Sequence, residues 1–295
     1  MLVVHHNSQN VNIGKAVANF FAYRFGTQIV YAICVQSNIR FNTSRTTSRS
    51  VFLCNGIIYP ITLQTKRGLS MYKHILFDLD NTLLDFNAGE REGIRAVFES
   101  EGIVFNDLNF KQYQDINKRL WLELEQGKVS KDDVLTTRFK EFFELFDLNV
   151  DARAKEAIFR KTLNNNHELV DGSKDILSYL KEAGYHLYSA SNGVYDTQMK
   201  RMHDAGIFDY FEDHFISEKI GFEKPHKQFF DHCLSGIKDD DVSHYLMIGD
   251  TLTSDIAGAN EYGIDSCYFD HQNLSNGDIA TYVINHLEVL KDICK

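Results

Sequence analysis

Short apolar runs alternate with stretches of helical periodicity along most of the chain. Helical spacing of apolar positions marks several of the intervening stretches, including 173–182, 227–234 and 255–263. The apolar runs are typical of buried strands; they are HILF (74–77), YHLYSAS (185–191), HFIS (214–217), YLMIG (245–249) and SCYF (266–269). Strands that alternate with helices in this way predict an α/β fold built on a doubly wound parallel sheet.

One interval breaks this alternation. Residues 89–168 lie between the first and second strands, where the apolar positions recur at helical spacing and the strand signal is weak. Within this interval SKDD (130–133) resembles a capping box with Ser130 as N-cap. We therefore expect a Rossmann-like core formed by residues 71–88 and 169–295, and an inserted helical cap domain formed by residues 89–168.

The first 70 residues differ in composition from the remainder. All 41 acidic residues lie in 71–295, whereas residues 1–70 carry only basic charges. The acid-poor run NTSRTTSRS fits a transit peptide, and IVYAICV is far shorter than the roughly 20 apolar residues of a membrane span. The third interpretation, which we favour, is a mis-assigned start. Met71 directly precedes the first strand, and KRG (66–68) can be encoded by a purine-rich run like a bacterial ribosome-binding site. Residues 1–70 are then a doubtful N-terminal extension and Met71 is the true start.

Composition narrows the classes of function. The 295 residues are 43% hydrophobic and 24% charged, which suits a soluble globular protein. A formal net charge of −10 argues against nucleic acid as the main partner, because such proteins carry basic patches. The five cysteines show no CxxC pairing, so they predict neither a disulfide framework nor a zinc site and fit a reducing cytoplasm. We expect a cytoplasmic protein without a membrane or nucleic-acid partner.

Polar clusters follow four of the predicted strands. The clusters are Asp78-Leu79-Asp80-Asn81-Thr82, Ser191-Asn192-Gly193, Lys224-Pro225, and Gly249-Asp250-Thr251 with Asp255. In an open parallel sheet, ligands bind beyond the carboxyl ends of the strands, so these clusters should meet in one place. Aspartates there can also be helix N-caps and turn formers, and Asp255 could simply cap the following helix. Four clusters in order, each at a strand end, favour a functional site.

The residue types in these clusters suit phosphoryl transfer. Several carboxylates around one divalent ion suit Mg²⁺, a hard cation that prefers oxygen ligands. An ionised aspartate can attack phosphorus and form an aspartyl phosphate, while a carboxylate two positions on protonates the leaving alkoxide and then activates water. The Ser191 hydroxyl and the Lys224 ammonium can hold the phosphoryl oxygens. These clusters predict a Mg²⁺-dependent phosphomonoester hydrolase.

The motifs DLDNT, SNG, EKP and GDTLTSD, in this order, resemble those of haloacid dehalogenase superfamily phosphatases. The resemblance covers essentially all of residues 71–295. It implies that Asp78 is the nucleophile and a Mg²⁺ ligand, and that Asp80 is the general acid/base and ligates Mg²⁺ through its backbone carbonyl. Inserted helices such as those expected at 89–168 resemble the cap that closes over the site and selects the substrate.

The remaining site roles follow from the same resemblance. Ser191 binds the phosphoryl group, and Lys224 neutralises it and orients Asp78. Asp250 is a Mg²⁺ ligand, and Asp255 supports the site from behind the ligands. The expected substrate-binding residues are Thr82, Asn192 and Gly193.

The substrate is the least defined part of the resemblance. Asp80 argues against dehalogenases, which lack it, and phosphonatases usually carry a small residue there. The runs SNG, GFEKPHKQFF and GDTLTSDIAGAN resemble bacterial pyrimidine-nucleotide 5′-nucleotidases, which implies a nucleoside monophosphate as the small phosphorylated partner. A phosphoglycolate or sugar-phosphate phosphatase, a hexose-phosphate mutase and a non-catalytic binding module stay open. The aromatic residues Trp121, Phe142 and Phe143 are candidates for stacking on a base, although their helical spacing favours core packing.

Overall fold

The computed structural model describes residues 72–271 and 277–295, together with the backbone of five strands nearer the N-terminus. The chain divides into two units, Met1–Gly68 and Leu69–Lys295. In the first unit, β1 (Asn10–Ile13), β2 (Ala16–Phe25) and β3 (Gln28–Cys34) form an antiparallel sheet, and β4 (Val51–Cys54) pairs with β5 (Ile57–Pro60). These five strands were not predicted from the sequence. The start expected at Met71 lies outside the described residues.

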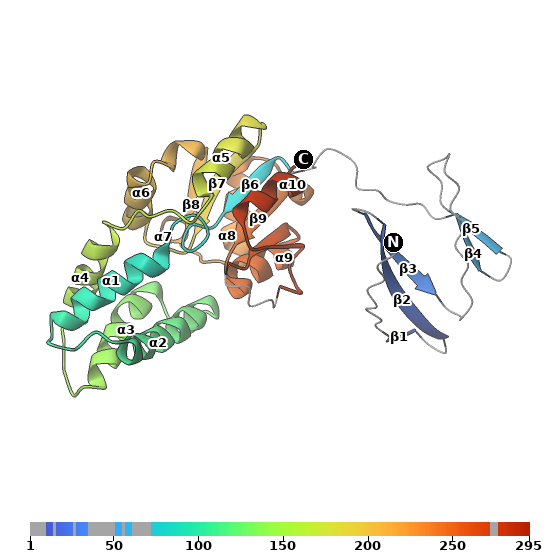
Figure 1. The fold of residues 1–295 in the computed structure, drawn as a ribbon. Helices are drawn as coiled ribbons and strands as arrows, with labels where there is room; N and C mark the ends of the chain where they lie inside the picture. Colours follow the sequence, from blue (N-terminus) through green and yellow to red (C-terminus); the bar gives the residue numbers. More distant parts are fainter. Residues whose placement is uncertain are drawn as a thin grey trace. The chain divides into compact units, whose positions relative to one another are not determined.

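The second unit is built on a six-stranded, fully parallel sheet, as predicted (Figure 1). The spatial order of the strands is β11-β10-β9-β6-β7-β8. Their bounds are β6 (His74–Phe77), β7 (His186–Ser191), β8 (Asp213–Ile216), β9 (Tyr245–Gly249), β10 (Asp265–Phe269) and β11 (Tyr282–Ile284). Five of these strands match the predicted apolar runs within one residue at each end. The edge strand β11 was not predicted, because it has three residues and only one of them is buried.

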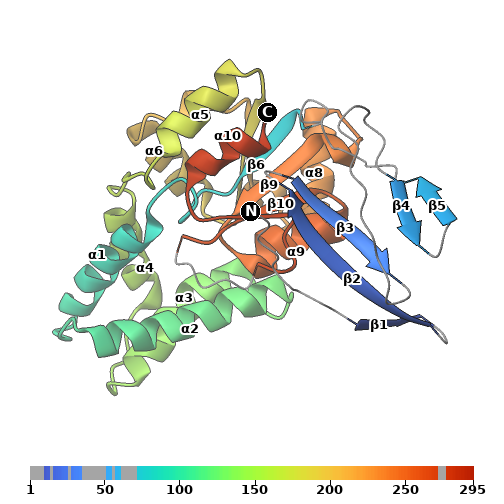
Figure 2. The ribbon, with the colours of Figure 1, turned by 45° about the vertical axis from the view of Figure 1, so that its right-hand side comes forward.

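Strand β6 lies inside the sheet and sends side chains to two hydrophobic cores, one on each face. Ile75 and Phe77 pack in the core that includes Leu177 of helix α5 (Ser173–Glu182), whereas Leu76 packs in the core that includes Phe229 of helix α8 (Lys227–Ile237). Alternate residues of a strand point to opposite faces, so a strand covered on both sides reads as a continuous apolar run. Both faces are covered by helices (Figure 2). The helices of this core are α5 (Ser173–Glu182), α6 (Tyr195–Asp204), α7 (Ser217–Ile220), α8 (Lys227–Ile237), α9 (Ala257–Tyr262) and α10 (Leu290–Ile293).

Four helices follow β6 and form a separate helical layer beside the sheet (Figure 1). They are α1 (Phe86–Glu99), α2 (Asp107–Glu125), α3 (Lys131–Glu144) and α4 (Ala152–Leu163). The predicted capping box is present, since Ser130 and Asp133 satisfy each other's backbone N–H groups at the start of α3. These helices have a hydrophobic core of their own, in which Phe142 and Phe143 are fully buried. Neither phenylalanine can stack on a bound base, so that role is excluded and core packing is confirmed.

The chain passes between core and cap twice, and the two connections run side by side. Leu84 and Leu169 form an antiparallel bridge. On either side of it, Asp85 N donates to Glu168 O at 2.9 Å and Val170 N donates to Leu83 O at 3.0 Å. The cap is therefore attached through one narrow, hydrogen-bonded pair of segments.

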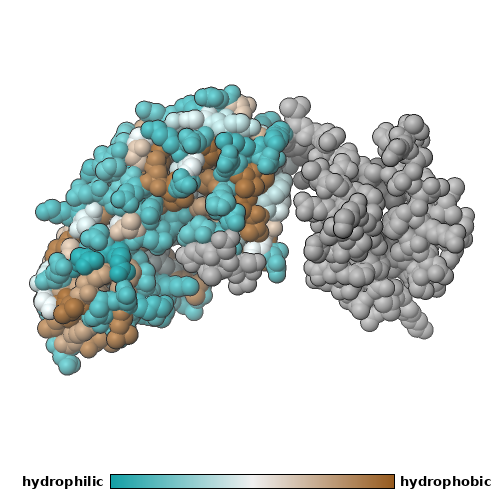
Figure 3. Space-filling view, viewed as in Figure 1, coloured by the Kyte–Doolittle hydropathy of each residue, from teal (hydrophilic) through white to brown (hydrophobic). Residues whose placement is uncertain are grey.

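Hydrophilic side chains dominate the face of the second unit seen in Figure 3, with apolar surface gathered in patches on the cap and on the core. Among the residues that the structure describes, no helix is both long enough and apolar enough to cross a bilayer.

Candidate active site

The turn after β6 brings the carboxylate of Asp78 and the hydroxyl of Thr82 together. Asp78 N donates to Ile248 O of β9 at 2.8 Å, which fixes the end of the strand. Leu79 O accepts from the N–H groups of three following residues, and Asn81 adopts φ 59°, so the chain turns sharply. The turn places Thr82 beside Asp78, and Thr82 Oγ1 donates to Asp78 Oδ2 at 3.2 Å. Thr82 thus contacts the expected nucleophile.

Lys224 lies between two carboxylates and is only 1% exposed. Its Nζ donates to Asp78 Oδ1 at 2.8 Å, to Asp255 Oδ1 at 2.7 Å and to Ala190 O at 2.6 Å. Burial alone would lower the pKa of Lys224, but Asp255 and Asp78 together raise it above its ordinary value. Lys224 is therefore held as a buried cation in direct contact with the Asp78 carboxylate.

The backbone of Lys224 is held by Asn192. The Asn192 side chain donates Nδ2–H to Lys224 O at 2.9 Å and accepts from Lys224 N at 2.8 Å through Oδ1. An amide that pairs with both backbone groups of one residue fixes that residue's position closely. We expected Asn192 to bind substrate; in this structure its side-chain amide is committed to the loop that carries Lys224.

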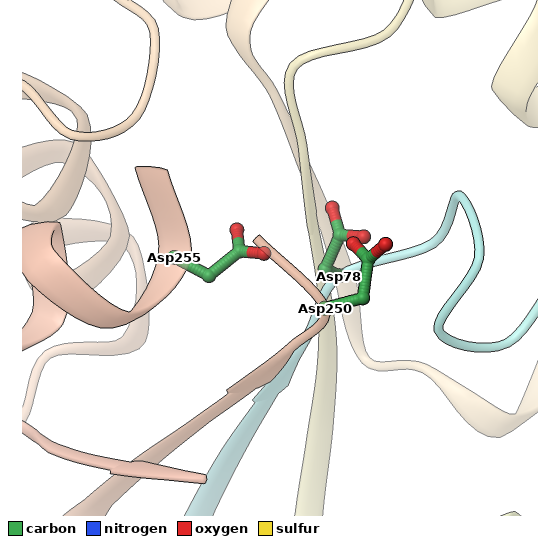
Figure 4. Close-up of side chains that lie close together, drawn as sticks. All are labelled: Asp78, Asp250 and Asp255. Carbon is green, nitrogen blue, oxygen red and sulfur yellow. The ribbon is translucent and has the colours of Figure 1, made fainter. Parts of the chain in front are cut away.

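Three carboxylates meet at the carboxyl ends of β6 and β9. One carboxylate oxygen from each of Asp78, Asp250 and Asp255 lies within 4.8 Å of the other two (Figure 4). Burial raises the pKa of Asp78 to about 7, against the opposing effect of Lys224. Burial and the neighbouring carboxylates raise the pKa of Asp250 well above its ordinary range. Three neighbouring carboxyl groups thus share one lysine, and their all-oxygen donors fit a hard divalent cation such as Mg²⁺.

Asp255 is tied to the protein through both of its oxygens. Besides Oδ1, which accepts from Lys224, its Oδ2 accepts from Thr251 N at 3.1 Å. A Cβ on Gly249 would lie 2.2 Å from Asp255 Oδ2, so only glycine leaves room for this carboxylate. Asp255 lies within a π-type turn, Leu252–Ile256, and does not cap α9, whose N-cap is Ile256. Asp255 is therefore not the N-cap of α9, and its carboxylate joins Lys224 to the backbone of Thr251.

Asp80 lies outside this carboxylate cluster and faces α6. Its Oδ2 accepts from Gln198 Nε2 at 2.8 Å, and its Oδ1 pairs with Arg201 Nη1. Gln198 Nε2 also donates to Ser191 Oγ at 2.9 Å, and Gly193 N donates to the same hydroxyl at 3.0 Å. Sequence reasoning missed Gln198 and Arg201. Their i,i+3 spacing on the helix after the second cluster was the available signal.

The cap reaches the site through the turn between α2 and α3. Lys131 Nζ donates to Ser217 Oγ at 2.6 Å and to Gly193 O at 3.3 Å, and lies 3.6 Å from Glu223 Oε1. Burial raises the pKa of Glu125, at the end of α2, although a hydrogen bond with Thr253 opposes that shift. These two cap residues were also missed. The expected site residues all lie at the carboxyl edge of the sheet. Lys131, next to this turn, contacts that edge at Gly193 and Ser217.

Comparison with known proteins agrees with this geometry. The sequence model of the family of haloacid dehalogenase-like hydrolases matches residues 72–263 of this chain. The HAD-hydrolase YfnB of Bacillus subtilis is 38% identical over 76% of this chain and 96% of its own length. The pyrimidine 5′-nucleotidase PynA of Streptococcus pneumoniae is 35% identical, over 75% of this chain and 94% of its own. The pyrimidine 5′-nucleotidase YjjG of Escherichia coli is 29% identical, over 75% and 97%.

A solved structure gives the same result. The crystal structure of magnesium-bound YfnB superimposes with a TM-score of 0.72 and covers 76% of this chain and 98% of the YfnB chain. The matching fold thus carries a cluster of three carboxylates, Asp78, Asp250 and Asp255, beside the buried Lys224. The chain belongs to the haloacid dehalogenase-like hydrolases, and it is a phosphatase.

Proposed function

We propose that this phosphatase is a Mg²⁺-dependent 5′-nucleotidase that hydrolyses pyrimidine nucleoside monophosphates through an aspartyl phosphate on Asp78. The observation that carries the chemistry is the pairing of Asp78 with the buried cation Lys224, beside Asp250. The names of PynA and YjjG, both pyrimidine 5′-nucleotidases, support the substrate class. The absence of CxxC pairing in the sequence favours the reducing cytoplasm as its compartment.

In the proposed reaction, an Asp78 oxygen attacks phosphorus and the bond from phosphorus to the ester oxygen breaks. Asp80 gives its proton to the departing alkoxide, then accepts a proton from the water that attacks the aspartyl phosphate. Inorganic phosphate leaves and Asp78 is restored. Lys224 and the Ser191 hydroxyl stabilise the phosphoryl oxygens as their charge shifts.

The carboxylates of Asp78 and Asp250 and the backbone carbonyl of Asp80 would hold the Mg²⁺. The bound ion would offset the repulsion between the carboxylates and the substrate phosphate. As the resemblance implied, we assign Asp255 not to the metal but to orienting Lys224, which donates to its Oδ1.

The direct test of this proposal is Asp78→Asn, measured as phosphate release from a panel with Mg²⁺ present. The panel holds dUMP, dTMP, UMP, AMP, phosphoglycolate and glucose phosphates. We expect the wild-type enzyme to favour the pyrimidine nucleotides and Asp78→Asn to lose turnover almost completely. The control Asp292→Asn changes an exposed carboxylate remote from the site and should keep full activity.

Two results would contradict parts of this proposal. Preference for a sugar phosphate or phosphoglycolate would keep the mechanism and overturn the substrate. Full activity in Asp78→Asn would reject the aspartyl phosphate.

Metal dependence is tested by binding as well as by activity. We expect titration calorimetry to detect Mg²⁺ binding to the wild-type protein and a much weaker signal with Asp250→Asn, which removes one of the two carboxylate ligands. EDTA should abolish phosphate release and added Mg²⁺ should restore it. Undiminished activity in the chelator would refute the metal assignment.

A further inference from the structure

Arg201 of α6 is completely buried, which is unusual for a guanidinium unless its donors are paired. Its Nη1 pairs with Asp80 Oδ1 and donates to Gln198 Oε1 at 3.3 Å. Its Nε donates to Asn166 O at 3.0 Å, and its Nη2 donates to Asn166 Oδ1 at 3.3 Å. One buried cation therefore joins the expected general acid/base to Asn166.

Gln198 completes a clamp on the Asp80 carboxylate. Arg201 engages Oδ1 and Gln198 engages Oδ2, so the plane of the carboxyl group is fixed from both sides. Gln198 is itself held in place, since its Nε2 also donates to Ser191 Oγ and its side chain fills the space that a Cβ on Gly193 would need. A general acid must present an oxygen within hydrogen-bond reach of the leaving group. The contacts with Arg201 and Gln198 fix the orientation of the Asp80 carboxyl oxygens.

Asn166 links this clamp to the attachment of the cap. It lies between the end of α4 and the bridge that Leu169 forms with Leu84, where the chain leaves the cap. Its side chain also packs against the start of α1, because a Cβ on Gly89 would lie 2.8 Å from Asn166 Cγ. Both connections of the cap thus meet at the residue that Arg201 holds.

We propose that Arg201, together with Gln198, is a positioning residue that aims the Asp80 carboxylate, and that Asn166 couples this aim to the position of the cap. This inference rests on the acid/base role proposed for Asp80. Arg201 does not touch the reacting atoms; it acts through Asp80. Its contribution should therefore matter only where Asp80 transfers a proton.

The test compares two esters in single-turnover formation of the aspartyl phosphate. p-Nitrophenyl phosphate releases a phenolate that needs no proton, whereas a nucleoside 5′-monophosphate releases an alkoxide that does. We expect Arg201→Met to slow phosphorylation by the nucleotide by about 10²-fold, the lower end of what a general acid contributes. Phosphorylation by p-nitrophenyl phosphate should change by no more than a few fold. The exposed cap variant Arg153→Met is the control and should match the wild type.

A second arm separates positioning from simple structural support. In an Asp80→Asn background, Arg201→Met should add no further loss with the nucleotide, because residues that act as one unit are non-additive. Gln198→Leu removes a neutral partner and should give the same ester-dependent pattern if Arg201→Met does not fold. An equal loss with both esters, or additive losses in the double variant, would overturn the proposal. Failure of the proposed function would be seen separately, as persistent activity in Asp78→Asn.

Discussion

At the scale of single residues, the charge balance of the site depends on Lys224. It is buried between Asp78 and Asp255, and removal of one partner of a buried ion pair leaves an uncompensated charge. We predict that Lys224→Met lowers the free energy of unfolding by about 3–5 kcal/mol. Urea denaturation measures this quantity. The matched control Lys227→Met breaks an exposed i,i+4 pair and should change it by about 0.5 kcal/mol or less. Equal effects of the two variants would contradict the prediction.

The residues that we propose for the chemistry could be named from the sequence because each follows a strand in a recognisable cluster. Asp78 and Asp250 are examples, since the carboxyl ends of parallel strands must converge. Arg201 could not be found in this way. A basic residue on a helix is normally solvent-exposed, and its burial here depends on Asp80 and Asn166, which lie far from it in the sequence.

At the scale of elements, one end of β6 contains a pH-sensitive contact. His74 packs against His186 of β7 and Tyr245 of β9, and its Nε2 lies 3.3 Å from Asp239 Oδ2. Burial lowers the pKa of His74, an effect that Asp239 only partly opposes and that His186 and Lys73 add to. The folded state therefore binds fewer protons than the unfolded chain, and stability should fall as the pH drops below the ordinary histidine value of about 6.5.

We predict that His74→Phe reduces this loss of stability between neutral and mildly acidic pH. Phenylalanine keeps a planar aromatic ring, so the ring contacts are kept while the titrating group is removed. Thermal unfolding followed over the pH series measures the difference, with the exposed His286→Phe as control. A loss of stability as large in His74→Phe as in the wild type would refute the assignment to His74.

Helices and strands of the second unit were predictable where burial left a clear pattern of apolar residues in the sequence. The five predicted strands are continuous apolar runs, and the cap helices repeat apolar residues at helical spacing. The π-type turn at Leu252–Ile256 was not predictable, because it forms where Asp255 accepts from Thr251 N and Lys224, contacts that no local periodicity encodes.

At the scale of the whole molecule, the chain divides close to the boundary that composition indicated. The division falls after Gly68, three residues before Met71. We propose that the phosphatase is complete without residues 1–70, because every residue named in its site lies beyond Met71. A chain that begins at Met71 should match the full chain in kcat/KM and in its melting temperature. A large fall in either would assign a role to the first unit.

The paired connections at Leu84 and Leu169 have a consequence for how such an enzyme can be altered. The two ends of the cap are hydrogen-bonded side by side. The inserted helices therefore do not push apart the two core segments to which they are joined. The loop-closure cost of the inserted length grows only slowly with that length. The cap helices can therefore be lengthened, shortened or replaced without separating these two segments, provided that Asn166 keeps its contacts with Arg201. Changes to the cap that leave Asn166 in place should then preserve the position of Asp80, whereas changes that move Asn166 should alter it.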